Sequence, residues 1–460
     1  MNPHAMTRLV RACRRGGTLL LVFLPVVLAS CDRSAPSTGP VAVQRVTGDL
    51  AAGPGSVVAT GELATAVVVL SHTASLQLFL ARYGLTELEV VDIGGTTYHL
   101  VQSNTLTDPA KLVEQLEGAG GEVSLVAQNP PVAAPEFEGE PMSFDDGNGM
   151  NTPTGYQNVK IVTQIRLAEA HSQMVGGQDV RVAVLDTGID AGHPALQGHY
   201  VLGNDYTVFP HRDSPLDVRN GLDDDGDHHI DEGFGHGTHV AGIVHFVAPQ
   251  ATIIAIRVLD DEGWGTAFGL ACGIEDAVAR GADVINLSMG LTESHPMIEE
   301  AVHYATAQGA AVVASAGNRA TTTLQYPASY GNAFSVTAVT RYDRLASFSN
   351  YNTAVDVSAP GVDIVSTFPV SSEIGPYAAG DGTSMAAPFL AGVTALALSA
   401  HPGMTGVEAA QRVVVTSRNI DALNSRYAEQ IGRGRVDAAA AVQDEMELPR
   451  PPAAGPVPRF

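Results

Sequence analysis

The sequence predicts an α/β fold in which helices cover both faces of a mainly parallel sheet, preceded by a small α+β domain. Between residues 157 and 445, apolar strand-like runs alternate with helical stretches, which is typical of a buried parallel sheet. Between residues 60 and 130 the expected order is β-α-β-β-α-β, typical of a ferredoxin-like domain. A hydrophobic share of 45% and a charged share of 16% favour compact domains over disorder.

Six apolar runs supply the expected strands of the larger domain. They cover residues 180–185, 252–258, 284–288, 311–316, 334–339 and 356–358. In folds of this type, active sites gather at the carboxyl ends of the parallel strands. We therefore expect functional side chains where these runs end.

The smaller domain shows both strand and helix signals. Strands are expected at 65–70, 87–93, 96–102 and 122–127, and helices at 74–83 and 109–117. Asp108 and Pro109 fit the cap and the first position of the second helix. Residues 131–156 follow as a linker open to cleavage, because they have no apolar period. We expect a disordered tail at residues 446–460.

The first thirty residues have the layout of a secretory signal, with arginines before an apolar run at residues 18–28. That run is short for a permanent membrane span. Leu28-Ala29-Ser30-Cys31 resembles the bacterial lipobox, which implies a lipid on Cys31 and attachment to the membrane. The alternative is an ordinary cleaved signal with an incidental cysteine. Residues 31–59, rich in Ser, Pro and Gly, are expected to form a tether.

A formal net charge of −24 argues against nucleic acid as a partner, because binding phosphates requires clustered Lys and Arg.

Three segments bring a carboxylate, an imidazole and a hydroxyl to the ends of strands or the starts of helices. Asp186 ends an apolar strand and is followed by Thr-Gly. His236 lies in Gly-His-Gly-Thr-His, where a glycine-rich approach leads into a helix. Ser384 lies in Gly-Thr-Ser-Met-Ala at another helix start, where free backbone N–H groups are available to hold an oxyanion.

Other readings of these segments have less support. Asp-Thr-Gly also occurs in aspartic proteases, but that chemistry requires two carboxylates and the sequence has no second copy. His236 and His239 could be a zinc pair, but the His-Glu-x-x-His pattern is missing. We expect His239 to be a hydrogen-bonded core histidine.

The segments, in the order Asp, His, Ser, resemble those of the subtilisin-like serine proteases, or subtilases. The resemblance covers about residues 157–445. Ser315-Ala316-Gly317-Asn318 matches the segment with the oxyanion-hole asparagine, and Asn286-Leu287-Ser288-Met289-Gly290 matches the strand that pairs with substrate. Tyr326-Pro327-Ala328 and Ser358-Ala359-Pro360-Gly361 match further landmarks.

The resemblance implies a three-layer subtilisin-like fold and hydrolysis of peptide bonds through an acyl-enzyme, with no cofactor needed for the chemistry. Ser384 would be the nucleophile, His236 the general base and Asp186 its partner, while Asn318 would stabilise the oxyanion. An extended peptide substrate would bind between two edges, formed by Ser288, Met289 and Gly290 and by Gly263, Trp264 and Gly265. Arg319, beside Asn318, would border the pocket for the residue before the cut.

The resemblance also implies a role for residues 60–130, since subtilases often carry a ferredoxin-like prodomain that assists folding and inhibits until it is removed. The alternative is an unrelated adaptor domain. Cleavage in the linker would leave the lipid with the prodomain. The uncleaved precursor would be a cell-envelope lipoprotein. After cleavage the catalytic domain would be either secreted or held in a noncovalent complex with the prodomain.

An acidic loop lies before His236 and is a candidate calcium site, because alternate acids around a glycine present hard oxygen ligands. Its candidate ligands are Asp223, Asp225, Asp227, Asp231 and Glu232. The alternative is a solvated acidic loop. The family's familiar strong calcium site is expected to be absent, because Ala195 follows His193-Pro194 where that site has an acid.

Two other functions remain open from the sequence. One is a catalytically silent, lipid-tethered scaffold or binding protein on the same fold. The other is a peptide ligase, which would use the same residues.

Overall fold

A computed structural model describes residues 63–136, 144, 152–157 and 159–443. The expected signal segment, Cys31, the whole of the tether and the tail lie outside these residues. So does most of the expected linker.

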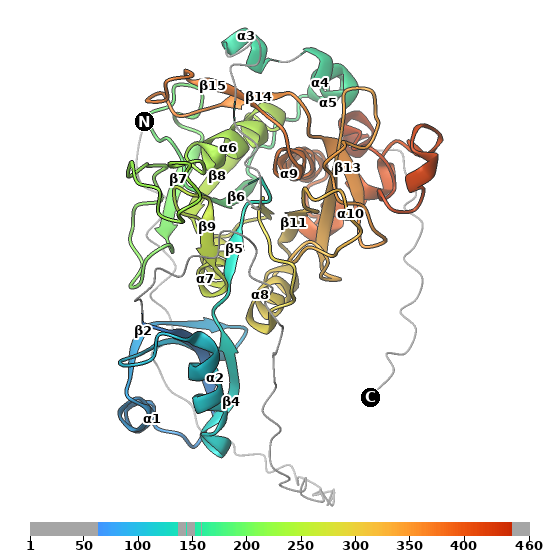
Figure 1. The fold of residues 1–460 in the computed structure, drawn as a ribbon. Helices are drawn as coiled ribbons and strands as arrows, with labels where there is room; N and C mark the ends of the chain where they lie inside the picture. The colour runs from blue at the N-terminus through green and yellow to red at the C-terminus, as the bar shows by residue number, and fades with distance from the viewer. Residues whose placement is uncertain (1–62, 137–143, 145–151, 158, 444–460) are drawn as a thin grey trace, which may run out of the picture. The chain divides into compact units, whose positions relative to one another are not determined.

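The small domain has the expected order of elements (Figure 1). It contains β1 (Thr65–Leu70), α1 (Leu76–Tyr83), β2 (Leu85–Ile93), β3 (Thr96–Ser103), α2 (Pro109–Glu117) and β4 (Val123–Gln128). The four antiparallel strands lie in the order β2-β3-β1-β4. Asp108 caps α2, because its side chain accepts hydrogen bonds from the backbone N–H groups of Ala110 and Lys111.

The larger domain is built on a seven-stranded sheet in the order β13-β12-β11-β10-β6-β8-β7. Its strands are β6 (Arg181–Asp186), β7 (Tyr200–Asp205), β8 (Thr252–Arg257), β10 (Val284–Leu287), β11 (Ala311–Ser315), β12 (Ala333–Val339) and β13 (Val357–Pro360). All neighbouring strands in this sheet are parallel. The predicted parallel α/β sheet is confirmed, with β7 as an additional edge strand.

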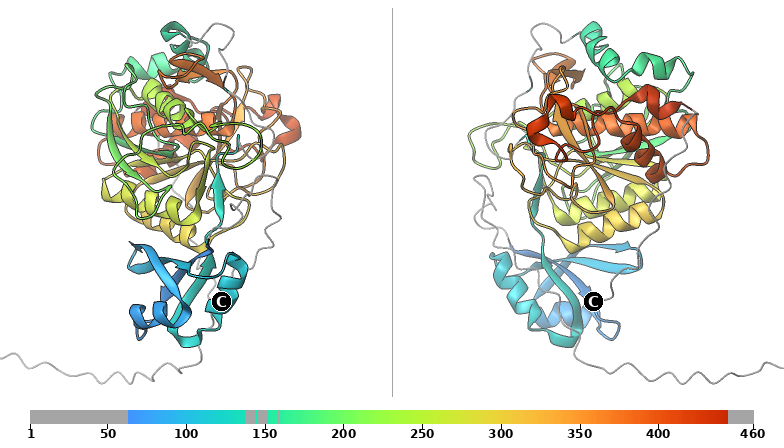
Figure 2. Two further views of the ribbon diagram at one scale, coloured as in Figure 1. Left: turned by 60° about the vertical axis from the view of Figure 1, so that its left-hand side comes forward. Right: turned by 90° about the vertical axis from the view of Figure 1, so that its right-hand side faces the viewer.

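Helices cover both faces of this sheet (Figures 1 and 2). One face carries α6 (His236–Val247), α9 (Thr383–Ala400), α10 (Gly406–Thr416) and α11 (Ala438–Val442). The other carries α7 (Ala267–Ala279) and α8 (Pro296–Ala307), which lie side by side. Alternate residues of β6 enter the two cores, with Val184 on the α6 face and Leu185 on the α7 face.

The remaining elements border this framework. They are the short helices α3 (Pro153–Tyr156), α4 (Val159–Gln164) and α5 (Leu167–His171), and the hairpin of β14 (Ile364–Thr367) and β15 (Tyr377–Gly380). Helix α9 alone among the described helices is long and apolar enough to cross a membrane. Its apolar window is 89% buried, so it is a core helix of this domain.

One segment differs from the sequence prediction. Residues 131–133, assigned to a linker, form strand β5 (Pro131–Ala133), which pairs with β9 (Trp264–Thr266) of the larger domain. The sequence did not indicate this strand, because residues 130 and 131 are prolines and the segment has no apolar period. The strand forms because a distant part of the chain supplies its partner.

The small domain packs against the larger one through its sheet. Val67, Ile93, Tyr98 and Leu100 share a hydrophobic cluster with buried residues of α7 and α8. Polar contacts surround this cluster: His211 Nδ1 lies 3.0 Å from Glu89 Oε2, and the Phe268 N–H donates to Asn129 Oδ1 over 2.9 Å. The chain then continues into β5.

Candidate active site

The three predicted catalytic side chains meet where one strand ends and two helices begin. Asp186 is the last residue of β6, His236 the first of α6 and Ser384 the second of α9. All three are fully buried. His236 Nδ1 lies 2.6 Å from Asp186 Oδ1, so the structure brings together the base and the carboxylate named from the sequence.

The protonation of His236 is governed by its neighbours. Burial alone would lower the pKa of the imidazole, but the negative charge of Asp186, and then that of Glu136, outweighs burial and raises the pKa to about 10. The two carboxylates together therefore favour the protonated imidazolium form of His236.

Asp217, which the sequence analysis did not single out, anchors the start of α6. Its carboxylate accepts hydrogen bonds from the N–H groups of Gly235 and Thr238, at 3.0 and 3.3 Å, and from the Thr238 hydroxyl at 2.6 Å. Burial raises the pKa of Asp217 to about 6. No local motif indicates this role, because Asp217 lies in a loop well before the helix.

Pro388 affects the backbone beside Ser384. It is the sixth residue of α9 and has no N–H to donate to the carbonyl of Ser384 one turn earlier. The hydroxyl of Ser288 donates to that carbonyl instead, over 2.9 Å. Ser288, predicted as part of a substrate edge, therefore also supports the start of α9, which carries Ser384.

Asn318 is oriented by the same helix start. Its Oδ1 accepts hydrogen bonds from the backbone N–H and the hydroxyl of Thr383, both at 2.9 Å. This fixes the amide so that Nδ2 faces the carboxylate that Ser384 also contacts. Nδ2 donates to Glu136 Oε1 over 2.9 Å.

Glu136 lies at the centre of the site, although the sequence placed it in a linker. Ser384 Oγ donates to its Oε2 over 2.6 Å, and His236 Nε2 lies 3.3 Å from the same oxygen. Glu136 is 2% exposed. A Cβ on Gly382 would come within 1.9 Å of Oε1, so the glycine provides the space for the carboxylate.

The residues before Glu136 lie between the two predicted substrate edges. Ala133 exchanges two backbone hydrogen bonds with Gly290, at 3.1 and 2.8 Å, and pairs with Trp264 on the other side. The Ala134 N–H donates to the carbonyl of Gly263 over 3.2 Å. The two edges thus bind an extended strand of the chain itself by strand addition.

His239 lies in the core. Its Nε2 lies 3.0 Å from the carbonyl of Ile364 and 3.1 Å from that of Ala378, so its donor serves two strands. Burial, and then the charge of His236, lowers the pKa of His239 to about 3. The ring of Phe144 packs against His239 with centroids 5.0 Å apart.

The acidic loop contains three of the five predicted metal ligands in one cluster. Carboxylate oxygens of Asp223, Asp225 and Asp227 lie within 4.8 Å of one another. Asp231 is used differently, because its carboxylate accepts the N–H groups of Asn220 and Gly221.

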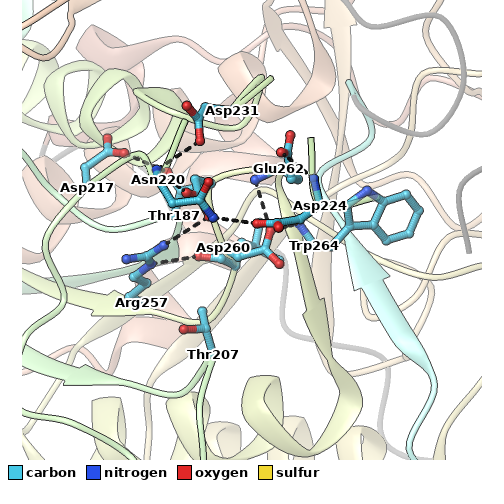
Figure 3. Close-up of polar contacts among 12 residues, drawn as sticks. Thr187, Thr207, Asp217, Asn220, Asp224, Asp231, Arg257, Asp260, Glu262 and Trp264 are labelled. Atoms are coloured by element: carbon cyan, nitrogen blue, oxygen red, sulfur yellow. Dashed lines mark hydrogen bonds and ion pairs between the residues drawn. The ribbon is translucent and has the colours of Figure 1, made fainter. Parts of the chain in front are cut away.

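The acidic loop is tied to the turn before β9 (Figure 3). The Asp224 N–H donates to Glu262 Oε1 over 3.2 Å. Trp264 Nε1 donates to Asp225 Oδ2, also over 3.2 Å. Glu262 is 1% exposed, and its Oε2 and that of Glu232 are buried without a hydrogen-bond partner. Buried carboxylate oxygens beside a carboxylate cluster suit a hard cation such as calcium.

The comparisons with known proteins cover the larger domain well. Residues 177–434 match the subtilase family. The thermophilic serine proteinase of Bacillus sp. (strain AK1) is 40% identical over 277 residues, which are 58% of this chain and 62% of that protein. Thermitase of Thermoactinomyces vulgaris is 39% identical over 277 residues, which are 58% of this chain and 90% of that protein.

Among solved structures, fervidolysin from Fervidobacterium pennivorans, described as a keratinolytic enzyme related to subtilisin, has a TM-score of 0.68 at 24% identity. The match covers 84% of this chain and 62% of fervidolysin, and it shows that the fold is shared. The family match includes the segments that carry Asp186, His236, Asn318 and Ser384. The chain belongs to the subtilase family of serine proteases.

Proposed function

We propose that the chain is an exported serine endopeptidase that cleaves polypeptides through an acyl-enzyme. The observation that carries this is the short contact between His236 and Asp186. Ser384 Oγ and Asn318 Nδ2 both donate to the carboxylate of Glu136 in the same site. A carboxylate bound in this way resembles the product of acyl-enzyme hydrolysis. Membership of the subtilase family supports the same activity.

In the proposed reaction, neutral His236 takes the proton of Ser384 as Oγ attacks the scissile carbonyl. The developing oxyanion is stabilised by Asn318 Nδ2 and by the Ser384 backbone N–H. The imidazolium, oriented by Asp186, then gives its proton to the departing amine. Water repeats the sequence on the acyl-enzyme, and no cofactor takes part.

The deciding experiment is labelling of the purified full chain with a fluorophosphonate probe. We expect the wild type to label after it is processed, and Ser384→Ala to remain unlabelled and intact. A folded, processed wild type that does not label would favour a scaffold or binding protein. Products joined to an added peptide amine, in place of hydrolysed ends, would favour a ligase.

We also propose that residues 60–130 are a prodomain that keeps the precursor inactive. This is supported by strand β5, which continues from that domain into the substrate edges, and by Glu136 in the catalytic site. Mass spectrometry of the wild type should find a cut in or near residues 131–156 that Ser384→Ala lacks. An intact wild type that is fully active would contradict the proposal.

Calcium is proposed as a structural ligand of the acidic loop, held by Asp223, Asp225 and Asp227, with Glu232 and Glu262 nearby. Bound calcium would join the loop to the turn that leads into β9 and so stiffen one substrate edge.

Chelation should lower the midpoint of thermal unfolding, and added calcium should restore it. An Asp223→Asn/Asp227→Asn variant should lose this response, whereas Asp213→Asn, an exposed acid outside the cluster, should keep it. An unchanged midpoint in the wild type would contradict the site.

Export and anchoring are proposed from the sequence alone. The arginine-led apolar segment and the lipobox-like Leu28 to Cys31 support a bacterial cell-envelope lipoprotein whose catalytic domain is either released or retained after maturation. In cells fed a labelled fatty acid, the precursor should take up label and Cys31→Ser should not. Equal labelling of both would exclude lipid on Cys31.

A further inference from the structure

The oxyanion position in this structure is filled by a side chain. During peptide cleavage the scissile carbonyl oxygen must receive the hydrogen bond from Asn318 Nδ2. Here Nδ2 donates to Glu136 Oε1, and Ser384 Oγ donates to the other oxygen of the same carboxylate. Two of the groups that must act on a peptide bond are therefore occupied by a side chain of the chain itself.

The same carboxylate also affects the base. Its Oε2 lies 3.3 Å from His236 Nε2, on the opposite side of the ring from Asp186. A negative charge on each side of an imidazole favours the protonated ring, and Asp186 and Glu136 together raise the pKa of His236. A protonated His236 cannot accept the proton of Ser384, so Glu136 opposes the first step of catalysis.

The position of Glu136 is fixed by the chain before it. Ala133 is paired with both substrate edges, and Ala134 is hydrogen bonded to Gly263. The carboxylate itself is buried and lies over Gly382, where there is no Cβ. A segment that was bound only as a substrate would instead present a peptide carbonyl to Asn318.

We propose that Glu136 is a latch that delays the first self-cleavage of the precursor, because its side-chain carboxylate occupies the place of the scissile carbonyl. The inference rests on the proposed protease function and adds a regulatory residue to it. No covalent bond is made or broken by the latch. When the carboxylate leaves, His236 releases its proton to solvent, and a peptide carbonyl can take the vacated hydrogen bond.

The test is the rate of self-processing of the full chain, followed by gel and mass spectrometry from the start of refolding. We expect Glu136→Gln and Glu136→Ala to be processed about tenfold faster or more, since each loses a charge-assisted contact. Glu114→Gln removes the same charge from an exposed site of the small domain and should match the wild type. Folded Glu136 variants that are processed no faster than the wild type would overturn the latch.

A second readout applies if the altered precursors mature too fast to observe or refold poorly. Ser384→Ala prevents self-cleavage, so the precursor state persists. In this background, NMR titration of His236 should give a lower pKa when Glu136→Gln is added. An unchanged pKa would mean that Glu136 does not act on the base, and the latch would be wrong.

The two proposals fail in different ways. If the wild type eventually matures and labels with fluorophosphonate, but Glu136→Gln gains no speed, the protease function stands and the latch alone is wrong. If no variant, nor the wild type, is cut or labelled, the protease function is wrong and the latch with it.

Discussion

Ser288 contacts Ser384 through both its hydroxyl and its backbone carbonyl. Its Oγ donates to the Ser384 carbonyl that Pro388 leaves without a helical donor, while its own carbonyl lies 3.1 Å from Ser384 Oγ. Ser384, the proposed nucleophile, is thereby held at both its backbone and its side chain by one residue.

Ser288→Ala should therefore leave a buried carbonyl unsatisfied, which costs about 1–3 kcal/mol of stability. Because the start of α9 would shift, we expect kcat to fall more than KM rises. Urea unfolding of the Ser384→Ala chain, with and without Ser288→Ala, measures the stability. Steady-state kinetics of the Ser288→Ala variant with Ser384 intact measure kcat and KM. Ser294→Ala, at an exposed serine, is the matched control. Equal losses in both variants would argue against a specific role for Ser288.

Gln325 is the residue whose position suggests control of specificity. It is 2% exposed, and its Nε2 is buried without a hydrogen-bond partner. Its side chain lies within 2.6 Å of where a Cβ on Gly290 would be, and within 2.9 Å of one on Gly317. Gly290 pairs with Ala133 and Gly317 precedes Asn318, so Gln325 borders the space for the side chain before the cut.

Gln325→Ala should enlarge this space and raise kcat/KM for peptides with a bulky residue before the cut, relative to peptides with alanine there. Arg319, to which the sequence pointed, has an exposed side chain, and Arg319→Ala serves as the comparison. A preference that changes with Arg319 and not with Gln325 would restore the original hypothesis.

At the scale of the element, a buried acid holds the start of α6. Asp217 holds the N–H groups of Gly235 and Thr238, so it fixes the first turn, which begins with His236. Loss of a capping side chain typically costs about 0.5–2 kcal/mol. Since His236, the proposed base, lies in this turn, the loss should also affect catalysis.

Asp217→Ala should lower both the unfolding free energy and kcat of the processed enzyme. Asp217→Asn keeps one acceptor oxygen and should recover part of the unfolding free energy and part of kcat. Asp213→Ala, at an exposed aspartate nearby, should leave both unchanged. If Asp217→Asn were as impaired as Asp217→Ala, the charge of Asp217, and not its hydrogen bonds, would be the important property.

The success of sequence-based prediction also varies by element. The predicted strands of the large sheet and the elements of the small domain lie within about two residues of the observed bounds, because each has its own apolar pattern. Asp186, His236 and Ser384 could be proposed from the sequence because short local motifs surround them. Strand β7 was missed because Val201 and Leu202 are exposed and Gly203 interrupts the run. Glu136 was missed because its partners lie 100 to 248 residues away.

At the scale of the whole molecule, the charge on His236 couples folding to pH. Its ring is faced by Asp186, Glu136 and the neutral His239. A pKa raised from 6.5 to about 10 gives a stabilisation that is complete below pH 6.5 and is lost as the pH rises to about 10. The unfolding free energy of the Ser384→Ala precursor should therefore fall over this range.

Other groups also titrate in this range, so the comparison variant is essential. The Ser384→Ala/Glu136→Gln chain should lose less stability between pH 6.5 and 10 than Ser384→Ala alone, as measured by urea unfolding at each pH. Parallel curves for the two chains would show that Glu136 contributes nothing to the charge on the ring.

If residues 60–130 act as the proposed prodomain, the continuity of β4 with β5 has a consequence for release of the proposed enzyme. Only two residues separate the last strand of the small domain from the strand in the substrate cleft, so the domain and the cleft strand form one bivalent ligand. Each contact keeps the other at a high effective concentration. A single cut after β5 would leave both contacts intact. Free enzyme would then emerge only when the small domain is itself destroyed, and the first free molecules would destroy it in their neighbours, so that release across a population would begin slowly and then accelerate.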